Sequence, residues 1–75
     1  MSKKIVEYHI NRLKDKSPDA RLNAINELIL IGDPDALEAL QHVFQNDPDE
    51  DIRKAAQKAG REIFIKNRSQ ATTGE

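Results

Sequence analysis

Apolar residues recur along this chain every three or four positions, the spacing that places side chains on one face of an α-helix. They fall into four stretches, near residues 3–15, 18–31, 34–46 and 48–67, and none shows the alternation of a strand. The apolar positions are Ile5, Val6, Ile10 and Leu13; Leu22, Ala24, Ile25, Leu28 and Ile29; Ala36, Leu37, Leu40, Val43 and Phe44; Ile52, Ala55, Ala56, Ala59 and Ile63. The pattern predicts an all-α protein of four helices.

Three of the helix starts carry the same pair of residues, a capping residue followed by proline: Ser17-Pro18, Asp33-Pro34 and Asp47-Pro48. The first supplies a side-chain acceptor for the free N–H groups, and proline suits the first helical position because its missing N–H would be unpaired there. The loops between the helices are short, so neighbouring helices are expected to pack antiparallel. The four helices therefore form two helical hairpins.

The two hairpins are copies of one unit. Ser17-Pro18-Asp19 matches Asp47-Pro48-Asp49 at an offset of 30. At an offset of 32 the matched residues are Arg21 with Arg53, Ala24 with Ala56, and Ile31 with Ile63. A period of about thirty residues built from two helices indicates a helical-repeat protein.

We therefore expect one domain over residues 1–68, with repeat one at about 3–32 and repeat two at about 33–67. The two antiparallel hairpins would stack as a short α-solenoid. The polar segment 69–75 is expected to be a flexible tail.

The repeat resembles the short HEAT-like repeats typified by phycobilisome lyases and many bacterial scaffold proteins. The matching residues are Asp49, Ile52, Arg53, Ala55, Ala56 and Ala59 in the second copy, and Asp19, Arg21, Ala24, Leu28 and the segment 31–37 in the first. The resemblance covers about residues 5–65. It implies that the first helix of each pair lies on the convex side, that the second lines a concave side, and that the protein docks on other proteins.

Two residues depart from the family's pattern: Ala20 replaces a valine and Gly60 replaces a core leucine. A glycine within a helix costs about 1 kcal/mol relative to alanine. We expect repeat two to be loosely closed at Gly60, or a neighbouring backbone to approach there. Arg21 and Arg53 stand at the family's recurring arginine position. They are expected to be structural, each tying a helix start to an acid such as Asp33 or Asp49, or to a carbonyl.

Composition restricts the function. The 75 residues include no cysteine, which excludes disulfides, a thiolate nucleophile and a cysteine zinc site. The net charge of −1 lacks the strongly basic balance expected of a nucleic-acid-binding domain. The longest apolar run, residues 28–31, is too short to cross a membrane, and the N-terminus has no continuous apolar segment of a signal peptide. A cytoplasmic protein is expected.

No catalytic or metal-binding arrangement is predicted. His9 and His42 lie on different helices and lack an i, i+4 partner. Asp47, Asp49 and Asp51 alternate like the opening of a calcium loop, but its sixth and twelfth positions hold Ile52 and Lys58 instead of glycine and glutamate. A non-enzymatic protein without a cofactor is therefore expected, with these acids as helix caps.

The candidate binding surface is the inner face of the second and fourth helices. Its predicted residues are Asn23, Asn26, Glu27, Leu30, Lys54, Lys58, Arg61 and Ile65. Together with Arg68, the cations of the fourth helix form a stripe that is either a solvated face or a basic, partly apolar groove for an acidic protein surface. Binding of nucleic acid is the alternative, although the stripe has no aromatic residue to stack on bases. A second alternative function is that of an accessory subunit in a pigment-handling enzyme complex.

Two repeats are few, since helical repeats bury their faces against neighbours and about three are usually needed. A core this small supplies about 3–5 kcal/mol. We expect the protein to complete its core by self-association or by docking on a larger partner. Candidate contact residues are Tyr8, Phe64 and Ile65.

Overall fold

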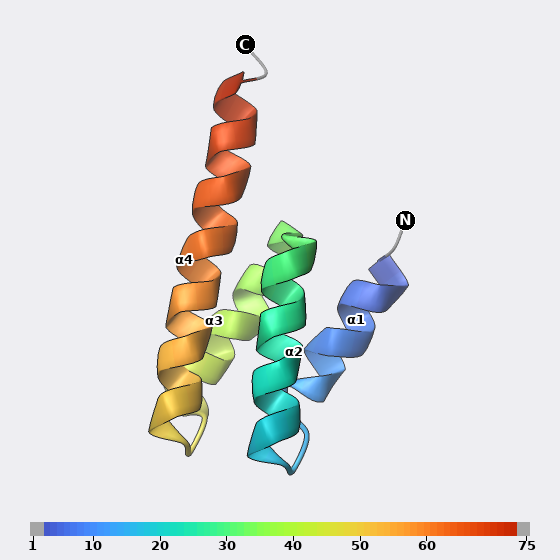
Figure 1. Ribbon diagram of the computed structural model, residues 1–75, viewed down its shortest axis with the longest axis vertical. Coiled ribbons are helices and arrows are strands. Elements are labelled where there is room, and N and C mark those ends of the chain that lie inside the picture. The colour runs from blue at the N-terminus through green and yellow to red at the C-terminus, as the bar shows by residue number, and fades with distance from the viewer. Residues whose placement is uncertain (1–2, 74–75) are drawn as a thin grey trace.

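The protein is built from four α-helices and one short 3₁₀ helix in a computed structural model (Figure 1) that describes the backbone of residues 3–73 and the side chains of residues 3–68. The elements are α1 (Lys3–Arg12), α2 (Pro18–Ile31), the 3₁₀ helix η1 (Pro34–Ala36), α3 (Leu37–Asn46) and α4 (Glu50–Thr73). The all-α class and the four helices expected from the sequence are confirmed.

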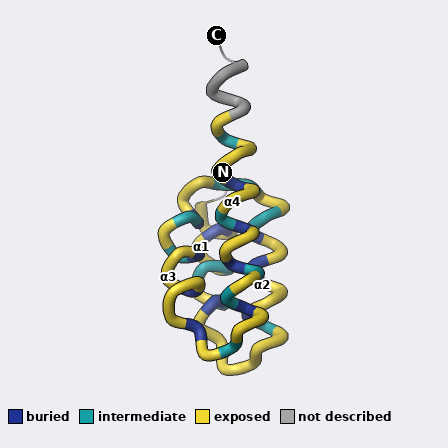
Figure 2. Tube along the Cα trace, turned by 90° about the vertical axis from the view of Figure 1, so that its left-hand side faces the viewer, coloured by how far each residue is buried: buried dark blue, intermediate teal, exposed yellow. Residues whose placement is uncertain are grey.

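The helices form two layers. α1 runs antiparallel to α2, and α3 runs antiparallel to α4, so each pair is a helical hairpin (Figure 1). α2 and α4 run parallel and side by side in one layer, with α1 and α3 in the other (Figure 2). The 24 residues of α4 span about 36 Å, and its C-terminal turns extend beyond the other helices. This overhang gives the molecule its longest dimension of 42 Å.

One hydrophobic core fills the space between the layers. The buried apolar residues are Val6, Leu13, Ala24, Ile25, Leu28, Ala36, Leu40, Val43, Ile52, Ala56, Ala59 and Ile63. All of them except Leu13 lie within the helices, on the apolar stripes expected from the sequence. The expected stripes were too wide in three places, because Ile5, Leu22 and Phe44 are between 38% and 49% exposed. They lie on the flanks of their helices, which the two-layer core does not cover.

Several helix boundaries differ from those expected. α1 ends at Arg12 instead of 15, because Leu13, Lys14 and Asp15 bond to carbonyls three residues back and tighten the last turn. The third helix begins as η1 before α3 takes over. α4 continues to Thr73, past the expected end at 67. The backbone of the expected polar tail is thus helical over 69–73, residues 74 and 75 lie outside the described residues, and the flexibility of the tail stays a prediction.

α2 ends at Gly32, which adopts the left-handed conformation with φ 71° and ψ 19°. Its N–H donates to the carbonyl of Leu28 at 2.9 Å, which closes the last turn of the helix. Its own carbonyl accepts a 3.0 Å hydrogen bond from the Asn67 side chain of α4. Gly32 therefore turns the chain out of repeat one and joins α2 to α4.

Gly60 has no such backbone role. A Cβ added there would meet no atom within 4 Å, so the expectation that a neighbouring backbone approaches Gly60 is wrong. The missing side chain instead opens a surface groove between α3 and α4. The two glycines therefore differ in what an added methyl group would meet.

Replacing each glycine by alanine is predicted to change stability in opposite directions. Gly32→Ala lowers the free energy of unfolding by about 1–2 kcal/mol, because alanine is strained at positive φ. Gly60→Ala raises it by about 0.5–1 kcal/mol, because alanine is the better helix former and the site has room. Urea unfolding followed by circular dichroism at low protein concentration measures both. Equal effects of the same sign would contradict these roles.

Candidate functional site

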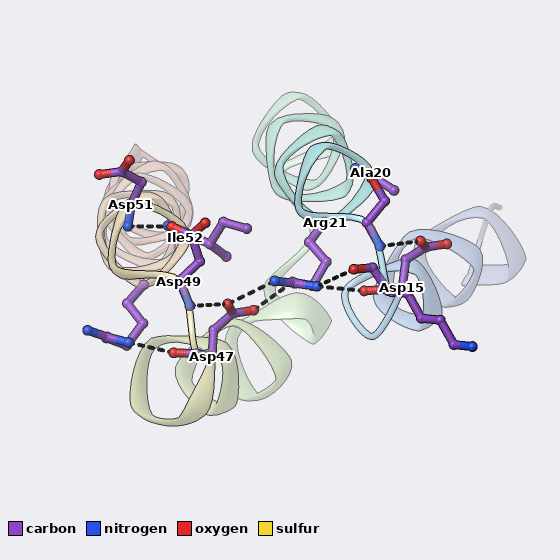
Figure 3. A network of polar contacts seen from close by, with 10 residues as sticks. Asp15, Ala20, Arg21, Asp47, Asp49, Asp51 and Ile52 are labelled. Carbon is purple, nitrogen blue, oxygen red and sulfur yellow. Dashed lines mark hydrogen bonds and ion pairs between the residues drawn. The ribbon is translucent and has the colours of Figure 1, made fainter.

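The most buried polar contact of the protein joins Arg21 at the start of α2 to Asp47 at the end of α3 (Figure 3). Nε of Arg21 lies 2.8 Å from one carboxylate oxygen of Asp47, and Nη2 donates to the other oxygen at 3.2 Å. The two side chains are only 11% and 5% exposed. This two-point contact links the first hairpin to the second.

Three further hydrogen bonds surround this pair, whereas the Nε of Arg21 contacts Asp47 as an ion pair without hydrogen-bond geometry. Nη1 of Arg21 donates to the carbonyls of Asp15 and Lys16, at 2.8 and 3.2 Å, in the loop between α1 and α2. Oδ1 of Asp47 also accepts from the N–H of Asp49 at 2.9 Å. One ion pair thus holds both hairpin loops at the same end of the molecule.

Arg53 repeats part of this arrangement in the second hairpin. Its Nη1 donates to the Asp47 carbonyl at 2.6 Å, six residues back, as Arg21 does to Asp15. Both arginines bond to a loop carbonyl, one of the two expected kinds of partner. Arg21 also pairs with an acid of the other repeat, but that acid is Asp47 and neither of the two named examples, Asp33 and Asp49. Asp49 is occupied as the cap of α4, accepting from the N–H groups of Asp51 and Ile52 at 2.8 and 3.4 Å.

A second, exposed ion pair connects the start of α1 to the link between the repeats. Nζ of Lys3 lies 3.0 Å from Asp33 and 2.6 Å from Asp35. The hydrogen bonds of Asp35 and then Asp33 raise the pKa of Lys3 above its usual value. The pKa of Asp33 is lowered, first by the N–H of Asp35 and then by Lys3. The contact therefore stabilises the folded protein fully at any pH between the normal aspartate pKa and the normal lysine pKa. This stabilisation is lost as the pH falls through the lowered pKa of Asp33 or rises through the raised pKa of Lys3.

Each predicted binding residue is exposed on α2 or α4, the two helices that lie side by side, but Arg61 borders the groove between α3 and α4. Leu30 of α2 is 74% exposed and Ile65 of α4 is 52% exposed. The other predicted residues, all exposed as well, are Asn23, Asn26, Glu27, Lys54, Lys58 and Arg61. Lys54 lies 3.6 Å from Glu50 in an exposed i, i+4 pair. We call the face centred on Leu30, Lys58 and Ile65 the inner face.

A feature that sequence reasoning missed lies on the far side of α4. There a groove of about 370 Å³ separates α3 from α4, with Leu37, Phe44 and Phe64 beside Gly60 and with Arg61 as its one charged residue. Comparison of the repeats at the offset of 32 could have found it. Where repeat one has the buried Ile25 and Leu28, repeat two has Gln57 and Gly60.

The two histidines have different surroundings. The ring of His9 meets the ring of Tyr8 edge-on at 5.0 Å between centroids, and its Nδ1 is buried without a hydrogen-bond partner in the described part of the chain. His42 lies on the exposed side of α3, where the Asn46 side chain contacts its ring nitrogen at 3.4 Å. Among the described residues, no group of three or more His, Cys, Asp or Glu side chains is arranged to hold a metal ion.

Two stacked hairpins with a two-layer core and a repeated arginine define a short α-solenoid. The sequence model for HEAT repeats matches residues 2–60 of the chain, and the protein belongs to this family. HEAT repeats are generally protein–protein interaction modules. No curated protein and no solved structure matches the chain significantly. Over the residues described, no helix is both long enough and apolar enough to span a membrane.

Breaking the Arg21–Asp47 pair is predicted to destabilise the protein severely. Asp47→Asn leaves the buried guanidinium without its countercharge, which costs about 3–5 kcal/mol when one partner of a buried pair is removed. Lys54→Gln removes the exposed pair with Glu50 as a matched control, worth about 0.3–0.5 kcal/mol. Thermal unfolding of both variants measures the difference. A loss below about 1 kcal/mol in Asp47→Asn would show that the pair does not hold the hairpins together.

Proposed function

We propose that this protein is a non-catalytic interaction module, a small adaptor or accessory subunit that docks on a larger protein through its inner face. Membership of the HEAT-repeat family supports the general function. The observation that carries the location is Leu30, a large apolar side chain that is 74% exposed on the layer formed by α2 and α4. Isolated exposed leucines are common, but Ile65 is exposed on the same layer and the cations of α4 accompany it.

The chemistry of the inner face indicates the kind of partner. The α4 half carries Lys54 and Lys58, whose long side chains expose both an apolar stem and a charge. The α2 half carries the amides Asn23 and Asn26, which can bond to backbone or side chains alike. A partner segment with acidic and apolar side chains, such as one face of an amphipathic helix, matches this combination.

A rigid support holds this face. α2 and α4 are joined near one end by the bond from Asn67 to the Gly32 carbonyl, and the Arg21–Asp47 pair lies near the other. Pre-organised surfaces lose less conformational entropy on binding than mobile ones. The protein would therefore bind without refolding, supplying a surface and no reacting group.

Binding of nucleic acid is the alternative function. The cations of α4 favour it, but Glu27 and Glu62 lie on the same two helices and reduce the positive potential. An accessory role in a pigment-handling enzyme complex is a special case of the adaptor function and rests on the family resemblance alone.

Capture from native lysate by the immobilised protein tests the proposal. We predict that Leu30→Asp and Lys58→Glu each reduce recovery of the same partner protein about tenfold or more, because one places a charge in the apolar centre and the other reverses a complementary charge. Lys16→Glu, the same charge change in the α1–α2 loop, should retain it.

Two outcomes would contradict the proposal. Undiminished capture by both inner-face variants would remove this face as the binding surface. Loss of the captured material after nuclease treatment, with binding to DNA that falls steeply as salt increases, would favour the nucleic-acid function instead.

A further inference from the structure

The groove between α3 and α4 is part of a larger exposed surface. The 370 Å³ groove beside Gly60 and a second groove along α3 share two lining residues, Leu37 and Gln41, so the two grooves adjoin. We call the surface around both grooves the α3–α4 surface. The residues that matter below are Leu37, Glu38, Phe44, Gly60, Arg61 and Phe64.

The middle of the α3–α4 surface is apolar and open. Phe64 is 54% exposed and Phe44 is 38% exposed. Gly60, which lines the same groove, has no side chain to cover them. At the offset of 32 the counterpart of Gly60 in repeat one is Leu28, which is fully buried. A position that repeat one fills and buries is thus left open in repeat two, and covering the two aromatic rings would be favourable.

One charge of each sign borders this apolar middle. Arg61 lies on the α4 side and Glu38 lies on the α3 side. Both side chains are exposed, and neither makes a hydrogen bond or an ion pair with another residue in the described part of the chain. Apart from His42, the other residues that line the two grooves carry no ionisable group. An acid and a base therefore stand unpaired on opposite sides of an apolar centre.

A surface of this kind is complementary to itself. In a two-fold contact both subunits use the same surface, so that if residue i meets residue j, residue j also meets residue i. α3 and α4 run antiparallel along the groove (Figure 1). A two-fold axis parallel to the groove would set α3 of each copy against α4 of the other. Glu38 would then meet Arg61 of the second copy at two places, with the apolar middles between them.

We propose that two copies of this chain form a symmetric dimer through the α3–α4 surface, with Phe44 and Phe64 covered and a Glu38–Arg61 ion pair on each side. The apolar side chains supply affinity, and the charge pairs fix the register. A purely acidic partner would complement Arg61 but repel Glu38, whereas a second copy complements both.

This dimer is separate from the function proposed for the inner face. Leu30, the centre of the inner face, lies on α2 and does not line either groove of the α3–α4 surface. Arg61 is the one residue common to the predicted inner face and this surface. Glu38 belongs to the α3–α4 surface alone, so its substitution tests the dimer without touching the inner face.

Charge reversal tests the proposal, with particle mass measured by light scattering over a range of protein concentrations. For the wild type, the mean mass should rise with concentration from that of one chain to that of two, and no further. Arg61→Glu places two carboxylates together at each side, and Glu38→Arg places two guanidinium groups together. Each variant alone should therefore dimerise about tenfold or more weakly than the wild type.

Two combinations should restore the dimer. The double variant, with Arg61→Glu and Glu38→Arg in one chain, exchanges the two charges and again forms an opposite-charge pair on each side. An equimolar mixture of the two single variants should also dimerise like the wild type, because both pairs of the mixed dimer are then of opposite charge. Recovery on mixing requires a contact between chains, since charges that act within one chain are not changed by mixing.

Two controls complete the test. Lys16→Glu, the same change of charge in the α1–α2 loop, and Leu30→Asp on the inner face should both dimerise like the wild type. Circular dichroism establishes that every variant is folded. A wild type that stays monomeric up to about 1 mM, growth beyond a dimer, or single variants that fail to recover on mixing would overturn the proposal. Loss of the dimer in Leu30→Asp would place the contact on the inner face and would also overturn it.

Discussion

The structure depends on the buried ion pair between Arg21 and Asp47. Both charges leave water at a considerable cost, which is offset only where the geometry is good and the remaining polar groups are bonded. Here Arg21 meets both carboxylate oxygens and two loop carbonyls, and Asp47 also receives a backbone N–H. Apolar packing alone would hold two small hairpins together without fixing their register. The directional pair fixes how repeat one sits on repeat two.

Other contacts between the repeats lie away from this pair. The Asn67 side chain of α4 bonds to the carbonyl of Gly32, and Lys3 of α1 reaches Asp33 and Asp35. Each connects repeat one to the start of repeat two or to α4. The layer formed by α2 and α4 is thereby held near both ends, which gives the inner face a fixed shape.

Much of the fold could be predicted from the sequence because its determinants are local. The three-to-four spacing of apolar residues gave the helices, and Ser17-Pro18 marked the start of α2, where Ser17 does accept from the N–H of Ala20. The start of α4 was missed by two residues, because either Asp47 or Asp49 can cap a helix and only the tertiary contact with Arg21 decides which one does. The partner of Arg21 was missed for the same reason: it lies 26 residues away in the chain.

The surfaces were harder to predict than the core. Helical spacing correctly gave exposed positions such as Leu30 and Lys58, but an exposed residue does not reveal its partner. Helical spacing could not show that Gly60 faces open space, because this depends on the groove that α3 and α4 form around Phe44 and Phe64.

The central claim is that the buried pair makes the two hairpins a single cooperative unit. Equilibrium urea unfolding followed by two probes tests this most directly: the fluorescence of Tyr8, the one tyrosine and a residue of α1, and far-ultraviolet circular dichroism, which reports all helices. Coincident transitions indicate all-or-none unfolding. The account predicts one midpoint for both probes in the wild type. A Tyr8 transition at clearly lower urea than the loss of helix would show that repeat one unfolds independently, and would contradict it.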